Sequence, residues 1–406
     1  MFAFSSEDED LALPVSGRDP LGTQVVWQRR ARDLVPALTA ASREPAGFQL
    51  LLVAFAWWPQ FAARFGLPAK DSRNFFLLVE QAFARACRTC GHSWPLPGSR
   101  RLHDSPMHGV WFGLDARRDF LLDSPLANGT WGLYRGPAAS AGLIGEFGEL
   151  DPERAAAIRD ASDVLPRLFS GIAQALRDPA AQVVAFERKS FNVEKLAGLV
   201  ADPPQKKDIR AALVRPGSSP LTGKLARLLC EWDDEPLDAF VARAGQLLPE
   251  FAAALRAVGD CERYIACMDE AFERLAARPG LRRNELAAAL KVNMVELRAS
   301  RERFRASGTY DGLAQQRHAR LAEAPLDSTP ALADFLVTYH GEVSLARRTA
   351  PLVEWGDTGR LESVLAAADA DAGTDDEPLD ARTAWRNTYY LDALRHLALR
   401  TRKERR

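Results

Sequence analysis

The sequence lacks an excess of positive charge: 53 Lys and Arg against 54 Asp and Glu leave a net charge of −1 over 406 residues. A protein that binds nucleic acid through its overall electric field carries a clear excess of basic residues. That class is excluded here. Any contact with DNA must come from a local group of basic side chains.

Cysteine and long apolar runs are also scarce. The chain has five cysteines, an odd number, and its first ten residues are acidic where a secretory leader would be basic. The longest apolar run, Leu50–Trp58, has nine residues and ends at Pro59, whereas a bilayer-spanning helix needs roughly 20. We therefore expect a cytoplasmic protein without a disulfide framework and without a membrane partner.

Complete catalytic motifs are missing as well. The segment Leu221–Lys224, Leu-Thr-Gly-Lys, lacks the upstream glycine spacing of a phosphate-binding loop. The chain has no nucleophile-elbow, zinc-protease or dinucleotide-binding motif. These absences favour a binding protein over an enzyme, and no cofactor is expected.

Apolar residues at helical spacing are abundant. Hydrophobic residues make up 47% of the chain, with nine Trp and 20 Phe, which is enough to build buried cores. Strand-like alternation is clearest only at Gln182–Phe186. The predicted fold is mainly α, with multi-helix domains and one or two winged-helix or helix-turn-helix-like elements. The predicted helices cover 48–65, 75–87, 155–176, 238–258, 265–277, 331–339 and 381–399.

Composition shifts along the chain predict its division. Runs of acidic residues indicate a flexible tail and a linker, and stretches rich in proline and glycine mark breaks between helices. The predicted parts are an acidic flexible tail over 1–20, a helical domain over 21–165 that ends in a winged-helix-like segment, a helical domain over 166–368 with a helix-turn-helix-like element at 281–305, an acidic linker over 369–380, and a C-terminal helix with a basic tail over 381–406.

The segment Trp131–Leu150 is the first candidate interaction element. A short helix, a glycine-flanked turn and a second helix opening at Asp151-Pro152 are typical of the end of a winged helix. Gly145–Gly148 would form the tip of the wing, and Arg135 would contact a phosphate. Because this single arginine faces Glu146 and Glu149 in the same segment, a packing module that binds protein is the alternative.

The segment Leu281–Phe304 is the second candidate and has the phasing of a helix-turn-helix. Glu285–Leu290 would be the first helix, 291–293 the turn and Met294–Phe304 the second helix. Residues 281–320 hold nine basic and four acidic side chains. A helical hairpin with a solvated basic face is the alternative. The arginines predicted to bind backbone phosphates are Arg282, Arg283, Arg298, Arg301 and Arg305, the last three on one helical face.

Two further patterns point to metals. Cys87-x-x-Cys90-x-His92, followed by His103, has the ligand types of a structural zinc site, but a second cysteine pair is missing and Cys87 lies on an apolar stripe. Glu187-x-Lys189 follows the predicted strand in the manner of a PD-(D/E)xK nuclease, in which a carboxylate binds a divalent cation. Structural zinc and a metal-dependent nuclease are therefore kept as alternatives.

The order of features in the first 160 or so residues resembles a loose set of uncharacterised bacterial proteins encoded beside phage-defence and DNA-restriction genes. The residues that carry the resemblance are 19–22, 31–39, 129–135 and 142–144.

The resemblance implies an accessory subunit that works with a larger ATPase, helicase or nuclease. We expect a non-catalytic subunit that binds DNA or a partner protein in a bacterial antiviral assembly. A metal-dependent nuclease and a protein scaffold without DNA binding are the alternatives.

Overall fold

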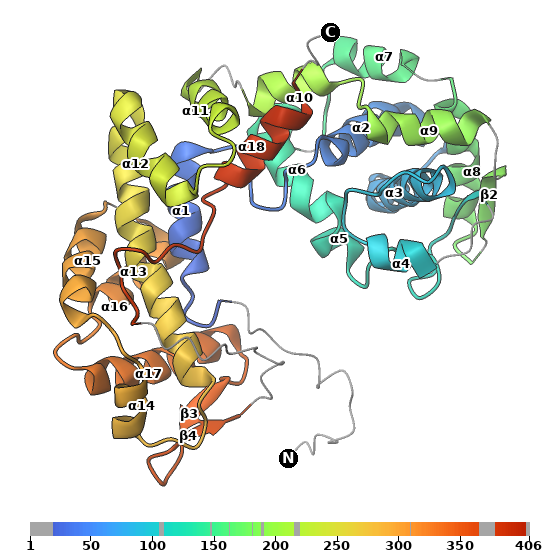
Figure 1. Cartoon of the computed structure of the whole chain (residues 1–406). Helices are drawn as coiled ribbons and strands as arrows, with labels where there is room; N and C mark the ends of the chain where they lie inside the picture. Colours follow the sequence, from blue (N-terminus) through green and yellow to red (C-terminus); the bar gives the residue numbers. More distant parts are fainter. Residues whose placement is uncertain are drawn as a thin grey trace. The chain divides into compact units, whose positions relative to one another are not determined.

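The computed structural model describes residues 19–104, 109–146, 148–161, 163–180, 182–187, 191–214, 220–308, 310–364 and 378–402. It divides the chain into two compact units (Figure 1). Unit 1 consists of Met1–Leu34 and Asp234–Tyr389, and unit 2 consists of Val35–Asp233 and Tyr390–Arg406. Both units are mainly helical, which confirms the predicted fold class.

Unit 2 is built around two adjacent helices, α2 (Pro45–Phe65) and α3 (Ser72–Thr89), both buried over most of their length. Two short strands, β1 (Gly109–Phe112) and β2 (Val183–Glu187), pair antiparallel beside them. The other helices of unit 2 are α4 (Ser99–Asp104), α5 (Pro125–Asn128), α6 (Thr130–Ser140), α7 (Pro152–Asp160), α8 (Leu165–Arg177), α9 (Phe191–Ala201), α10 (Lys206–Leu213), α11 (Pro220–Glu231) and α18 (Leu391–Arg400), together with a 3₁₀ turn, Ala69–Asp71.

Helix α2 shows why an apolar segment folds as a central helix. Pro45 occupies the first turn, where the missing N–H costs nothing, and Gly66 ends the helix at a φ of 64°. The helix passes through Pro59 without ending there, so the predicted apolar run is part of a longer helix. Its length and hydropathy would suit a bilayer span, but 67% of its most apolar window is buried inside the protein, as in the core helix of a globular unit.

Unit 1 is arranged around its longest helix, α13 (Ala252–Ala276). Four other helices of the unit pack against it, namely α1 (Gln24–Leu34), α12 (Leu237–Leu247), α15 (Met294–Ala306) and α17 (Thr329–Arg347). The remaining elements of unit 1 are α14 (Arg283–Ala289), α16 (Gly312–Ala322), the strands β3 (Val353–Trp355) and β4 (Leu361–Ser363), and a 3₁₀ turn, Pro249–Phe251.

A small antiparallel arrangement of strands lies beside α14 and α17. β3 and β4 form a hairpin, and β4 also pairs with the chain just before α14. In that second pairing Arg282 stands opposite Arg360, and Leu361 exchanges backbone hydrogen bonds with Gly280 and Leu281. The order across the sheet is therefore 280–282, β4, β3.

The observed units differ in their bounds from the predicted domains. The predicted boundary at 165/166 falls at the start of α8, inside unit 2. The C-terminal helix, α18, packs on α11 within unit 2. The predicted tail (apart from residues 19 and 20) and residues 369–377 of the linker lie outside the described residues. The predicted strand at Gln182–Phe186 is confirmed as β2, shifted by one residue.

Each unit buries titratable side chains. In unit 2, Glu80 of α3 is 3% exposed and accepts a hydrogen bond from the backbone N–H of Thr130 at the start of α6, and burial raises its pKa to about 7. In unit 1, His340 of α17 accepts a hydrogen bond from the N–H of Leu352 on Nε2. The proton must then lie on Nδ1, which is 3.0 Å from the carbonyl oxygen of Pro20. His340 thus joins three parts of unit 1 as a neutral ring.

We expect Glu80→Gln to change how stability depends on pH. Because the folded pKa lies above the unfolded value, wild type loses stability as pH rises from about 4.5 to about 7. The variant does not titrate there. Its free energy of unfolding should therefore rise relative to wild type by roughly 2–3 kcal/mol between about pH 4.5 and pH 8, as measured by chemical denaturation. Glu153→Gln, at an exposed position of α7, is the control, and equal curves for both variants would contradict the prediction.

We expect His340 to act in the opposite direction. Burial lowers its pKa below the usual value of 6.5, so its contribution to stability is complete above about pH 6.5 and is lost as pH falls below it. Thermal unfolding between about pH 5 and pH 7.5 should show a steeper loss of stability at low pH for wild type than for His340→Gln. The exposed His103 provides the control variant His103→Gln, which should follow wild type.

Candidate functional site

The segment predicted as a helix-turn-helix contains two helices at the predicted positions. Arg282 begins the first, α14, and donates its backbone N–H to Glu285 Oε2 at 2.7 Å. Asn293 begins the second, α15, and its side chain accepts from the N–H of Glu296. Between them Lys291 has a φ of 37°, and its carbonyl oxygen accepts from the N–H of Leu379, so the turn is held by a distant part of the chain.

The two helices pack against different partners. α14 packs mainly against α17, whereas α15 packs against α13 and α16. Leu286 of α14 and Leu297 and Phe304 of α15 are fully buried in the core of unit 1. The apolar phasing thus predicts the burial of Leu286, Leu290 and Leu297 correctly, but it is wrong for Val295, which is 69% exposed. Which helix lies against which was decided by residues that come later in the chain.

Arg298, Arg301 and Arg305 lie on one face of α15, as their spacing predicts, and this face is occupied by the chain itself. Arg305 donates to the carbonyl oxygen of Ala322 at 2.9 Å, Arg301 to that of Ala324 at 2.9 Å and Arg298 to that of Leu326 at 2.7 Å. Arg298 also reaches the carbonyl oxygen of Asp327 at 3.3 Å. We call these three side chains the arginine ladder.

The arginine ladder donates to the last carbonyl group of α16 and to carbonyl groups of the chain that follows this helix. Ala322 is the last residue of α16, and the last four carbonyl groups of a helix have no partner within it. Guanidinium groups suit this position because they oppose the negative end of the helix dipole and donate from several N–H groups at once. Glu302, within 3.1 Å of both Arg301 and Arg305, neutralises part of their charge.

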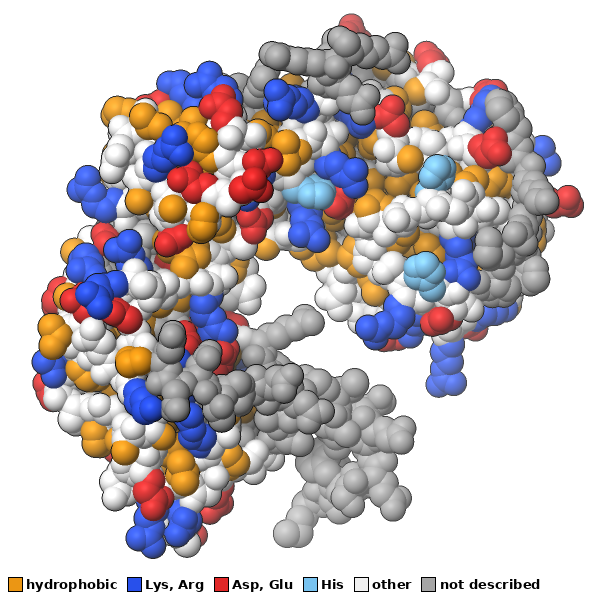
Figure 2. Space-filling model, viewed as in Figure 1, with side chains coloured by type: hydrophobic (Ala, Val, Ile, Leu, Met, Phe, Trp, Pro, Cys, Tyr) orange, Lys and Arg blue, Asp and Glu red, His pale blue; other side chains and the backbone are white. Residues whose placement is uncertain are grey.

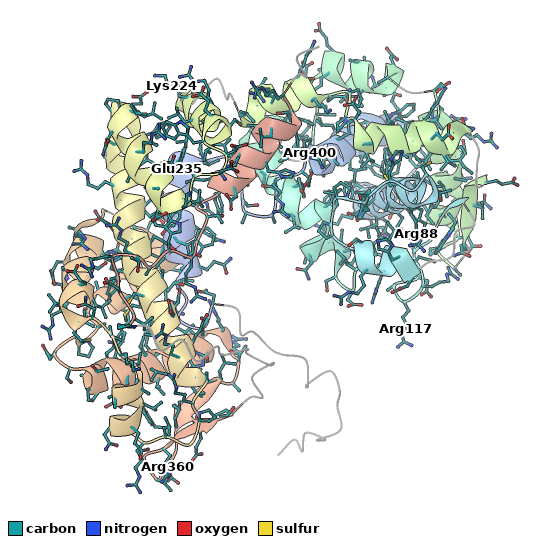
Figure 3. All side chains as sticks on the ribbon, in the orientation of Figure 1. Arg88, Arg117, Lys224, Glu235, Arg360 and Arg400 are labelled. Carbon is teal, nitrogen blue, oxygen red and sulfur yellow. The ribbon has the colours of Figure 1, made fainter. Side chains whose placement is uncertain are left out.

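The two other arginines of this segment lie beside the strand pairing. Arg283 forms an ion pair with Asp334 at 3.1 Å, and its guanidinium lies 4.9 Å from the centre of the Trp355 ring. Arg282 and Arg360 are exposed and stand opposite each other, and Arg360 is labelled in Figure 3. Directly opposed like charges destabilise a sheet slightly, and the guanidinium of Arg360 also donates to the carbonyl oxygen of Gly280 at 2.6 Å.

Acidic side chains accompany this basic pair. Glu354 and Glu362 stand opposite each other on β3 and β4, and Glu362 shares a sheet face with Arg360. Over the described surface in view, basic and acidic side chains are interspersed (Figure 2). The surface in view therefore has mixed charge.

The predicted winged-helix-like segment of unit 2 consists of α6 and α7 joined by turns. The described residues of 141–151 form no strand, and Gly145 and Gly148 lie in a turn in which Gly148 donates to the carbonyl oxygen of Gly145. Arg135 lies in the second turn of α6. Its guanidinium donates to the carbonyl oxygen of Glu146 and lies 5.6 Å from the centre of the Trp131 ring.

The predicted nuclease residues are placed on a minimal sheet. Glu187 is the last residue of β2 and is exposed, and Lys189 lies outside the described residues. The motif also needs a carboxylate upstream of this strand. The paired strand β1, Gly-Val-Trp-Phe, supplies none, and the upstream residue Asp163 forms an ion pair with Lys195 at 2.7 Å. Within the described ranges no three His, Cys, Asp or Glu side chains gather as a metal site.

The predicted zinc ligands are also divided between environments. Cys87 is fully buried on the apolar stripe of α3, and burial raises its pKa to about 12, which disfavours the thiolate that binds zinc. Cys90 is half-buried, and His92 and His103 are exposed. Two of the four side chains thus point to solvent while Cys87 is part of the core.

The structure brings together polar residues that the sequence analysis did not single out. Glu262 of α13 is fully buried, and its carboxylate accepts from the backbone N–H of Arg386 and Asn387, the Asn387 amide and the Tyr389 hydroxyl, the last at 2.9 Å. The sequence signal that could have identified Glu262 is its position between Val258 and Ile265, two apolar residues of the same predicted helical region. Its partners lie more than 120 residues away, beyond the reach of periodicity.

A stack of side chains crosses the same unit. The Arg30 guanidinium lies 4.0 Å from the centre of the Tyr310 ring, which stacks on His318 at 4.3 Å. His318 in turn contacts Phe304 at a ring distance of 4.3 Å, and burial lowers its pKa. Glu262 thus joins α13 to residues 386–389, and the stack joins α1, α15 and α16.

Comparisons with protein-family models, with curated proteins and with solved structures find no match to this chain. The candidate sites are therefore weighed on their geometry and charge alone.

We expect Arg301→Ala to destabilise unit 1. The substitution removes a charge-assisted bond and leaves the carbonyl oxygen of Ala324 without that donor, a loss of about 1–2 kcal/mol in the free energy of unfolding. Urea denaturation measures the change. The control is Arg32→Ala at an exposed position of α1, which should stay within about 0.5 kcal/mol of wild type. Equal stability of the two variants would show that the arginine ladder is not a structural element.

Proposed function

We propose that this chain is a non-catalytic binding subunit whose partner is a protein. The observation that carries the proposal is the arginine ladder. Phosphate binding requires cations that are free to replace the counterions of DNA. Three of the six arginines predicted to bind phosphates are already bonded to backbone carbonyl groups, and two more, Arg135 and Arg283, bind partners within the chain.

The arrangement around β3 and β4 supports the same proposal. We infer a winged-helix-like arrangement from the strand order 280–282, β4, β3 and from the packing of α14 on α17, with α17 in the place of the second helix. In a DNA-binding protein this helix would present basic side chains to the groove. Nine of the 19 residues of α17 are instead buried, and its Asp334 and Glu342 neutralise Arg283 and Arg320 beside it.

DNA binding is kept as the second candidate because of one observation. The exposed arginines Arg282 and Arg360 stand opposite each other, with Arg360 donating to the carbonyl oxygen of Gly280 at 2.6 Å, and a bound anion would offset the repulsion between them. This pair, with Arg283 beside it, is where a DNA backbone would bind. The contact would be small, so its affinity would depend on few released counterions.

The cellular setting follows from the resemblance in the first 160 or so residues. It supports a cytoplasmic subunit of a bacterial antiviral assembly in which a larger ATPase, helicase or nuclease carries out the chemistry.

The test is fluorescence-anisotropy titration of a short labelled DNA duplex from about 50 to 200 mM salt, with and without Mg²⁺. We expect no binding that falls steeply with salt and no cleavage of the probe, because the basic side chains are engaged within the chain. Co-expression with the products of adjoining genes should in parallel give a complex that survives high salt.

Two results would overturn the proposal. Tight, salt-dependent binding that is lost in the double variant Arg282→Glu, Arg360→Glu would establish the DNA-binding candidate. Cleavage in Mg²⁺ that is lost in Glu187→Ala would restore the nuclease. The matched control for the first result is the pair Glu354→Gln, Glu362→Gln on the same hairpin, which should not weaken DNA binding.

A further inference from the structure

A groove of about 280 Å³ runs along the outer side of α12 and α13 in unit 1. These two helices form a hairpin joined by the turn Pro249–Phe251, and they lie side by side in Figure 1. The groove follows one face of each helix. Its lining on α12 extends from Asp238 to Gln246, and its lining on α13 extends from Ala252 to Arg263, with Trp385 at one end.

Two glycines, Gly245 and Gly259, line the groove at positions where packing within the protein does not require glycine. Gly259 lies in the middle of α13, where glycine disfavours a helix relative to almost every other residue. A Cβ atom built on Gly259 meets nothing within 4 Å. Gly245 on α12 is similar, since its Cβ would meet only Leu255, at 3.8 Å. No packing within the protein requires these glycines, so the space above them is open to another backbone.

The two edges of the groove carry opposite charges. Asp238 lines the α12 side and gives it a negative charge, whereas Glu235, just before that helix and labelled in Figure 3, is paired with Arg243 at 3.6 Å. Arg256 and Arg263 line the α13 side. Asp260 also lies on the α13 side, but Arg303 approaches it to 3.7 Å, so the net charge of that edge is positive.

We infer that this face binds a second copy of the chain and forms a two-fold symmetric dimer. A two-fold interface uses the same surface on both subunits, so that surface must be complementary to itself. With an acidic edge on α12 and a basic edge on α13, rotation by a half-turn brings the acidic edge of each copy to the basic edge of the other. The two glycines let the helices approach closely, and the two hairpins together make a four-helix bundle.

The size of the groove sets the strength of the interaction. Stable interfaces bury roughly 1,200–2,000 Å² in total, and α12 is only 11 residues long. We therefore expect a weak dimer, with dissociation in the micromolar range, which salt weakens because charged edges contribute. The inference concerns self-association, and it stands or falls independently of the proposed protein partner and of DNA.

The experiment is sedimentation velocity of the full chain over a concentration series that spans the micromolar range. Wild type should shift from monomer to dimer as concentration rises. Gly259→Leu should stay monomeric at every concentration, because its side chain fills the groove. It should keep the helical circular-dichroism signal and melt no earlier than wild type, since leucine favours the helix. The control is Gly341→Leu, at a helical position of α17 where a Cβ also meets nothing within 4 Å.

A charge exchange tests the orientation. Arg263→Asp and Asp238→Arg should each weaken the dimer at least tenfold, and the double variant should recover most of that loss because each edge meets its opposite again. A wild type that remains monomeric throughout would overturn the inference. So would a dimer that survives Gly259→Leu, an equal effect of Gly341→Leu, or a double variant no better than either single one.

Discussion

Unit 1 depends on one buried carboxylate. Glu262 lies in the middle of α13, the helix on which α1, α12, α15 and α17 pack, and four donors from residues 386–389 converge on it. Burial raises the pKa of Glu262 even though these bonds favour the ionised form. A carboxylate in that position must be satisfied, so it holds the last segment of unit 1 against the central helix. The groove over α12 and α13 takes its shape from this arrangement, because Trp385 at its end belongs to the same segment.

The arginine ladder shows how a basic helical face can be structural. A row of arginines at intervals of three and four residues is equally suited to phosphates along a DNA backbone and to carbonyl groups along an extended chain. In this protein the carbonyl groups of residues 322–327 occupy the row. The bonds tie α15 to the end of α16, and they leave the pair Arg282 and Arg360 as the place where an anion could still bind unit 1.

Local patterns predicted the local structure well. The period of the apolar residues predicted a mainly helical protein, the position of β2 to within one residue, and both helices of the 281–305 segment. They did not predict that α14 would pack on α17, or that Arg298, Arg301 and Arg305 would bond to residues about 20 to 30 positions later. The predicted zinc and nuclease residues also depend on distant segments, and the structure does not bring them together. Cys87 is buried in the core, and β1, the strand that pairs with the one holding Glu187, has no carboxylate.

The sequence by itself determined that the chain is mainly helical, because helical period, capping residues and prolines act within a few positions along the chain. It did not determine every helix bound: the predicted helix 155–176 is two helices, α7 and α8, and the predicted helix 381–399 begins only at Leu391. Only the tertiary structure decided which charged faces remain free. A guanidinium can bond to a phosphate or to a backbone carbonyl group. Which of the two it binds depends on whether the fold places a carbonyl group from a distant segment beside it. The same holds for Gly259, whose open side is a property of the two packed helices and cannot be read from one of them.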